Sequence, residues 1–276
     1  MKNGARVKAG RTLTGGTVAF ATFLAASVAW GTAMAEETDR FLDVRLGIGA
    51  AFSEDAAFSD ENCASVDPAA YFGCGIGSDG RPFGAYGDFG SSVLIDAGLG
   101  VWVQDWLRAE ATVSYRPDLG FDGVANFSNV PNNTEPVRSD VESLSVMATG
   151  YVYPAPLLAL DLGPVNPFVS AGLGVAYNHT SQMDYEFPTL GPGSATITQG
   201  GSHTDFAWSL GAGLDVNIAE DWVLSLAYRY SDLGEVVTDR GDILVIRPPR
   251  QFTIPVGETM APLRLHEVFV SVRYAF

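Results

Sequence analysis

Lysine is almost absent from this sequence, since Lys2 and Lys8 are its two lysines. Residues 1–35 hold four of the 16 basic residues, so 12 remain beyond them, all arginine, against 32 acidic residues. A protein that binds nucleic acid needs a concentrated basic face. The charge balance therefore argues against a nucleic-acid partner. It favours acidic, solvated loops, with a specific cation site as the alternative.

Long hydrophobic runs are also missing once the first 35 residues are set aside. Basic residues at positions 2, 6, 8 and 11 precede an uncharged run from Thr12 to Met34, which closes on Ala33-Met34-Ala35. This pattern predicts a cleaved signal peptide over residues 1–35, with a transmembrane anchor as the alternative. In the remaining residues, 36–276, no stretch approaches the roughly 18 to 20 consecutive apolar residues of a spanning helix. We expect these residues to form one exported, all-β domain.

Cysteine is limited to Cys63 and Cys74. Export to an oxidising compartment favours a disulfide between them that closes a loop. The alternatives are a metal pair, which would need two further ligands nearby, and two free thiols. We expect no metal site, because no run of acidic residues has the spacing of a calcium loop, and we expect no cofactor.

Alternation of apolar and small or polar residues is the abundant signal. It recurs in eight segments of about ten residues, the length of a tilted strand that crosses a bilayer. The segments are 42–52, 92–103, 107–116, 144–152, 169–177, 205–218, 222–230 and 267–276.

Each segment has an apolar face and a second face of small or polar residues. The composition of this second face distinguishes two fold classes. A water-soluble sandwich, the alternative, would carry many Lys, Thr and Glu side chains there, whereas Gly, Ala and Ser dominate with a few charges. Small residues suit the interior of a narrow barrel, and the apolar face suits lipid. Closure is required in lipid because an open strand edge would leave backbone groups unsatisfied. The sequence therefore predicts a closed antiparallel eight-stranded transmembrane β-barrel.

The links between segments alternate in length. Short links fall at 104–106, 154–167 and 219–221, and long links at 53–90, 117–141, 178–204 and 232–265. Barrels of the outer membrane have short periplasmic turns and long extracellular loops. Within the last long link, residues 243–246 and 252–254 flank Arg247-Pro248-Pro249-Arg250. This pattern predicts a β-hairpin, with an irregular apolar loop as the alternative.

Charged residues on the second face are the candidate interior group. An eight-stranded barrel is only wide enough for side chains to fill, and a lone charge in a dry interior is costly. We therefore expect a paired network, with an ion path as the alternative. Its members are Asp43, Arg45, Asp96, Arg108, Glu110, Arg116, Asp205, Asp215, Arg229, Glu267 and Arg273.

Three stretches, 166–174, 208–215 and 228–234, resemble the small porin-family barrels of the OmpA, OmpX and opacity-protein type. The resemblance implies a bacterial outer-membrane location. It also implies a C-terminal signal read by the outer-membrane assembly machinery, which here comprises Val268, Val270, Val272, Tyr274 and Phe276.

Function is predicted to lie in the loops. We expect a structural or surface-interaction role, such as adhesion or envelope integrity, with outer-membrane lipid, lipopolysaccharide and an extracellular ligand as partners. A narrow porin-like channel is the alternative. A lipid A-modifying enzyme is a third possibility, suggested by His179-Thr180-Ser181 with Glu186 nearby. We expect no catalysis, because no carboxylate is placed on a strand to orient the histidine.

Overall fold

The computed structural model describes residues 42–60, 62–68, 70, 73–77, 79–127 and 135–276. The predicted signal peptide, 1–35, lies outside these residues. The described residues form fourteen β-strands and two short helical segments, α1 (Pro154–Leu157) and the 3-10 turn η1 (Pro188–Leu190). In these residues, no helix is both long enough and apolar enough to pass through a lipid bilayer.

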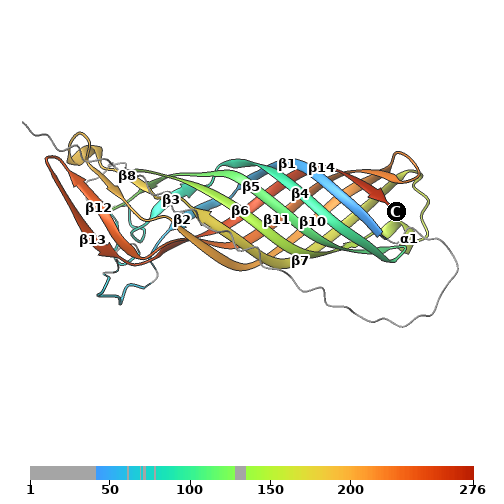
Figure 1. Ribbon diagram of the computed structural model, residues 1–276, viewed down its shortest axis with the longest axis horizontal. Helices are drawn as coiled ribbons and strands as arrows, with labels where there is room; N and C mark the ends of the chain where they lie inside the picture. Colours follow the sequence, from blue (N-terminus) through green and yellow to red (C-terminus); the bar gives the residue numbers. More distant parts are fainter. Residues whose placement is uncertain (1–41, 61, 69, 71–72, 78, 128–134) are drawn as a thin grey trace, which may run out of the picture. The chain divides into compact units, whose positions relative to one another are not determined.

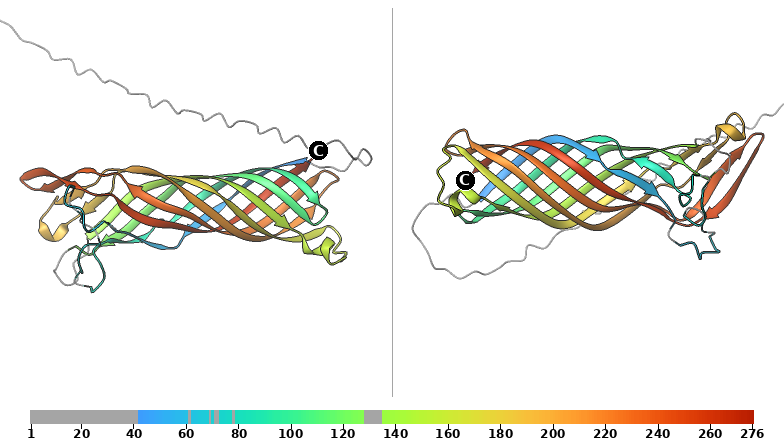
Figure 2. Two further views of the ribbon diagram at one scale, coloured as in Figure 1. Left: turned by 90° about the horizontal axis from the view of Figure 1, so that it is seen from below. Right: turned by 180° about the vertical axis from the view of Figure 1, so that it is seen from behind.

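Eight long strands pair in a ring. Each pairs antiparallel with two neighbours, and the last strand, β14, pairs with the first, β1. The twisted ring is visible in Figure 1 and, from two further sides, in Figure 2. Its strands are β1 (Leu42–Ser53), β4 (Ser91–Gln104), β5 (Leu107–Ala125), β6 (Glu135–Val152), β7 (Val165–Thr180), β10 (Gly201–Asn217), β11 (Trp222–Thr238) and β14 (Thr259–Ala275).

Six shorter strands extend the sheet, which the predicted count of eight did not include. The links expected to be loops contain β2 (Asp55–Phe58), β3 (Ala85–Asp88), β8 (Asp184–Glu186), β9 (Ala195–Ile197), β12 (Gly241–Arg247) and β13 (Arg250–Val256). β3 pairs with β2 and β5, and β8 and β9 connect β6 to β12. β12 and β13 form a hairpin, so the hairpin reading of this link is the correct one. In Figure 1, β8, β12 and β13 lie at the end opposite α1.

The ring strands are longer than the periodicity indicates, because β-bulges interrupt the alternation. β5 continues to Ala125 beyond a register shift between Arg116 and Leu119. Pro117 lies in this shift, and proline lacks the N–H that a regular ladder uses. β11 has a second shift between Asp232 and Glu235, where Gly234 has a φ of 73°. At a bulge, two successive inward side chains are no longer two residues apart in the sequence. In β5, for example, the inward residue after Arg116 is Leu119, so the strict period of two ends there.

The two faces of the ring differ in polarity. On β1, the outward side chains of Leu46 and Ile48 are 66% and 65% exposed, whereas the inward side chains of Asp43 and Arg45 are 0% and 4% exposed. A water-soluble protein has the opposite arrangement. The exposed apolar face is typical of strands that face lipid.

The ring interior has two layers. The layer nearer the turns contains the charged side chains. The layer nearer the long loops is an apolar cluster in which Phe58 and Phe121 pack edge to face, with ring centroids 5.0 Å apart. Phe89 lies 5.3 Å from Phe121. Other members come from around the ring, among them Ala51, Leu119, Val141, Ala176, Ala207, Leu233, Leu263 and Leu265.

Candidate functional site

The interior network contains five arginines and five carboxylates. All ten side chains are buried. They are the predicted interior residues with the exception of Asp205, which does not belong to the network. The members are Arg45, Arg108, Arg116, Arg229 and Arg273 with Asp43, Asp96, Glu110, Asp215 and Glu267. The five positive and five negative formal charges balance. Pairing of opposite charges is needed because each ion loses its contact with water when it is buried.

Glu110 of β5 is the first branch point of the network. Arg45 Nη2 donates to its Oε1 at 2.7 Å, and Arg108 Nη2 donates to its Oε2 at 2.5 Å. The hydroxyl groups of Thr112 and Tyr151 also donate to Oε1, at 2.8 and 3.1 Å. Arg45 Nε also donates to Oε2 at 3.0 Å. Each oxygen of this buried carboxylate therefore accepts hydrogen bonds from at least two donors, which offsets the cost of burying the charged form.

Glu267 of β14 is the second branch point. Arg116 Nε donates to Oε1 at 2.7 Å, and Arg229 Nε donates to Oε2 at 2.6 Å. Arg229 Nη1 also donates to Asp96 at 3.1 Å, and Asp96 pairs with Arg45 at 2.5 Å. One continuous chain of ion pairs thus connects Glu267 to Glu110 across the interior.

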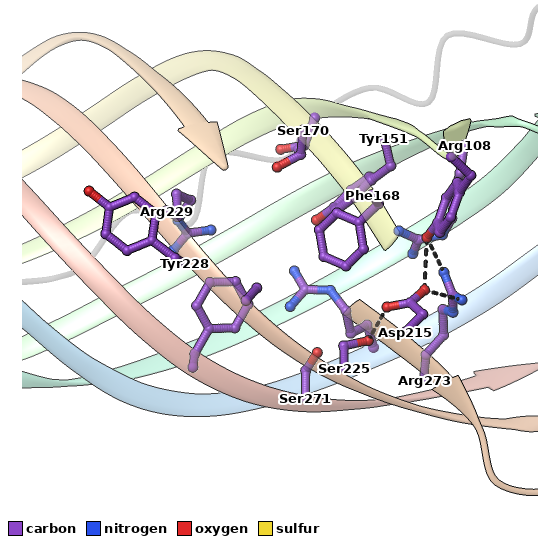
Figure 3. A pocket seen from close by; sticks show the side chains of 15 residues that line it. Arg108, Tyr151, Phe168, Ser170, Asp215, Ser225, Tyr228, Arg229, Ser271 and Arg273 are labelled. Carbon is purple, nitrogen blue, oxygen red and sulfur yellow. Dashed lines mark hydrogen bonds and ion pairs between the residues drawn. The ribbon is translucent and has the colours of Figure 1, made fainter. Parts of the chain in front are cut away.

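A smaller group surrounds Asp215 of β10, and Figure 3 shows this carboxylate between Arg273 and Ser225. Arg273 Nη2 donates to Oδ2 at 2.7 Å, Ser225 Oγ donates to Oδ1 at 2.6 Å, and Tyr153 Oη donates to Oδ2 at 2.9 Å. The cavity beside this group has a volume of about 20 Å³, close to the space of one water molecule.

Asp205 lies apart from the network. Its carboxylate accepts hydrogen bonds from the backbone N–H of Phe206 at 2.7 Å and of Glu235 at 3.2 Å. Glu235 follows the β11 bulge, so Asp205 satisfies a backbone donor that the bulge displaces from the ladder. The alternation alone did not indicate this bulge.

Aromatic side chains complete the interior, and the prediction did not include them among the site residues. The guanidinium carbon of Arg108 lies 4.9 Å from the Tyr151 ring centroid, and that of Arg229 lies 5.0 Å from the Phe269 centroid. That of Arg273 lies 5.4 Å from the Trp102 centroid. These contacts cover the faces of the cations, a stabilising arrangement when water is excluded. Trp102 continues the interior phase of β4, which is the signal that could have found it.

Glycine on the interior face provides the space for these side chains. A Cβ atom placed on Gly100 would lie 2.6 Å from the guanidinium carbon of Arg108 and 2.6 Å from Oδ1 of Asp43. Such a contact is far inside van der Waals distance. A Cβ atom on Gly98 would likewise lie too close to Cδ of Glu110. At these two glycines, long ionic side chains from neighbouring strands therefore lie directly over the backbone.

Residues 18–275 match the family model described as the outer membrane protein beta-barrel domain. The chain belongs to this family. It is a small outer-membrane β-barrel protein, and its location is the bacterial outer membrane. The description of this family gives a fold and a location, so membership alone does not assign a role.

Solved structures of similar fold include Neisserial surface protein A, at 16% identity and a TM-score of 0.38, with 84% of this chain and 97% of that chain covered. The outer membrane protein OprG from Pseudomonas aeruginosa has 11% identity and a TM-score of 0.47, with 84% and 95% covered. The outer membrane protease OmpT from Escherichia coli has 9% identity and a TM-score of 0.37, with 88% and 99% covered. No curated protein matches this barrel in sequence.

The C-terminal residues of the barrel alternate as the resemblance implies. Val268, Val270 and Val272 are exposed on the outward face of β14. Phe276 lies 5.1 Å from Tyr274 by ring centroid, and Tyr274 lies 4.9 Å from Trp222. These rings form an outward aromatic group at the turn end.

The disulfide between Cys63 and Cys74 is confirmed, with Cα atoms 5.0 Å apart. It lies in the link between β2 and β3. Further along this link, Asp79 accepts a hydrogen bond from the backbone N–H of Arg81, which lowers the pKa of Asp79 to about 2. This loop carboxylate therefore keeps its negative charge at neutral and mildly acidic pH.

The histidine group suggested as a catalytic site is arranged differently. His179 Nδ1 lies 2.8 Å from Ser202 Oγ, on the neighbouring strand β10, and Ser181 Oγ donates to the carbonyl of Gln182. Glu186 pairs with Arg138 at 3.6 Å. Glu142 lies opposite His179 in register, but its carboxylate accepts the Tyr115 hydroxyl at 2.9 Å.

Proposed function

We propose that the ring is a closed eight-stranded barrel that crosses the outer membrane, with short periplasmic turns and long extracellular loops. Two outward aromatic groups support this placement, one at the turn end of the strands and one near the middle of β10 and β11. The first contains Trp222, Tyr274 and Phe276, and the second contains Trp208 and Tyr230, with ring centroids 5.6 Å apart. Aromatic side chains prefer the two interfaces of a bilayer.

The role that the geometry supports best is structural or surface-interacting, through the extracellular loops, without catalysis. The carrying observation is the interior of the ring, where the described residues form a balanced ionic layer and an apolar layer between the strands. An eight-stranded barrel has room for side chains and little else. Recognition then falls to the loops, where acidic and aromatic residues are abundant. The assembly machinery, lipopolysaccharide and an extracellular ligand are the partners of this proposal.

A planar-bilayer recording tests the filled interior. We expect the refolded barrel to show no steady single-channel conductance, because the cavity in its charged layer has a volume of about 20 Å³. Heat-dependent gel mobility of the same sample checks that the barrel is folded. Steady, ion-selective openings from a folded sample would favour the channel and assign the ion path to the interior charges.

Lipid A composition tests the absence of catalysis. We expect cells that overproduce the protein to keep the same lipid A acyl pattern as cells with an empty vector, because no carboxylate is hydrogen-bonded to His179 among the described contacts. A serine nucleophile needs a base that a third group orients. Mass spectrometry of extracted lipid A gives the answer. An acyl chain that is lost in these cells but retained with the Ser202→Ala variant would contradict the proposal.

A further inference from the structure

A second cavity, which we name the hairpin pocket, lies outside the strand ring. Its volume is about 230 Å³, and its walls come mainly from β8, β9, β12 and β13. Figure 1 places β8, β12 and β13 at the end of the ring that is far from α1. Most of the lining is apolar: Phe127 precedes the undescribed residues 128–134, and the other apolar residues are Tyr185, Phe187, Ile243, Val245, Phe252 and Ile254.

The pocket combines a buried floor with an open side. Tyr185 and Ile243 are each 1% exposed, whereas Phe252 is 49% exposed. In the proposed orientation this end of the protein lies above the membrane, where lipid does not cover apolar side chains. An exposed aromatic ring beside a preformed apolar cavity is a common feature of sites for small ligands.

Arg247 is the charged group of the pocket. Its Nη1 donates to the carbonyls of Ala195 and Ile246, each at 2.7 Å, and its guanidinium carbon lies 4.4 Å from the Phe187 ring centroid. These contacts fix the guanidinium in place without neutralising it. In the part of the chain that the structure describes, no carboxylate is paired with Arg247, whereas each of the five interior arginines has one.

Charge complementarity indicates the ligand. The protein is strongly acidic, yet its apolar pocket presents a cation that is held by neutral carbonyls and an aromatic ring. Guanidinium groups bind carboxylates through charge-assisted hydrogen bonds. A ligand with a carboxylate at one end and an aliphatic body would satisfy both parts of the lining. The volume lies below the roughly 300 to 1,000 Å³ of sites for drug-sized molecules, so the body must be small.

We propose that the hairpin pocket binds a free medium-chain fatty acid, with its carboxylate on Arg247 and its alkyl chain between β8 and the β12–β13 hairpin. The site is additional to the surface role proposed above. It does not depend on the filled interior, so the conductance experiment and the binding experiment fail independently.

Titration calorimetry with decanoate tests the site, using the full barrel in phosphatidylcholine nanodiscs and subtracting the heat of empty nanodiscs. We expect saturable binding of one decanoate and weaker binding of decanol. The Arg247→Gln variant should lose at least about tenfold in decanoate affinity, the effect of losing one charged contact. Arg250→Gln is the matched control, because Arg250 pairs with Arg247 across the hairpin but does not line the cavity.

A second variant tests the apolar part. Val245→Phe adds volume inside the cavity, so it should weaken decanoate and decanol together, while gel mobility confirms that the barrel is folded. Absence of saturable decanoate binding to the unmodified barrel would overturn the proposal. Equal losses in Arg247→Gln and Arg250→Gln would also overturn it, since they would indicate general attraction to surface cations.

Discussion

Replacing Glu267 with alanine is expected to lower the free energy of unfolding by about 3–5 kcal/mol, the cost of removing one partner from a buried ion pair. Both Arg116 and Arg229 donate to this carboxylate, and Ser231 Oγ donates to it at 2.8 Å. The substitution leaves two buried cations with too few acceptors. Urea unfolding of the barrel in lipid vesicles, followed by tryptophan fluorescence, measures the loss.

Glu186→Ala is the matched control for this variant. Glu186 pairs with Arg138 at 3.6 Å, but both side chains are largely exposed, and an exposed pair contributes about 0–1 kcal/mol. We expect Glu267→Gln to fall between the two, because the amide retains one acceptor and loses the charge. Similar losses in Glu267→Ala and Glu186→Ala would show that the interior network does not stabilise the barrel.

The sequence was sufficient to predict an all-β antiparallel membrane fold, and alternation was the reason. An arginine on the small-residue face of a strand, such as Arg45 or Arg273, has only the interior available when the opposite face must contact lipid. The same rule selected all ten members of the network, and Asp205 outside it, without any knowledge of pairing. It could not give the partners, because register decides which carboxylate meets which guanidinium. Glu110 and Arg45 meet across two strand boundaries.

The short strands outside the ring were less predictable. The short strands β2, β3, β8 and β9 have three or four residues each, too few to show a period of two. Their pairing depends on long-range contacts with β5, β6 and β12. Asp205 shows that long-range pairing limits the prediction within the ring as well. Its carboxylate accepts a hydrogen bond from Glu235 beside the β11 bulge, and this bulge depends on how β11 pairs with β14. Arg247 was noted only as part of a turn, since nothing local indicates a pocket.

The apolar layer provides the second large effect. Phe121→Ala is expected to cost about 3–5 kcal/mol of unfolding free energy, because it removes a fully buried ring and leaves a cavity. Phe121 is 1% exposed and packs against both Phe58 and Phe89. Urea unfolding measures this loss as well. Phe252→Ala is the control, since its ring is 49% exposed, and we expect a change below about 1 kcal/mol.

The same variant separates stability from conduction. Phe121 belongs to the apolar cluster, whereas the ion pairs that join Glu110 to Glu267 form a different layer of the interior. If the two layers block the interior independently, Phe121→Ala destabilises the barrel but remains silent in a planar bilayer. Openings in Phe121→Ala that are absent from the unmodified barrel would mean that the aromatic cluster is the barrier to ions, and that the charged layer beneath it conducts once the cluster is removed.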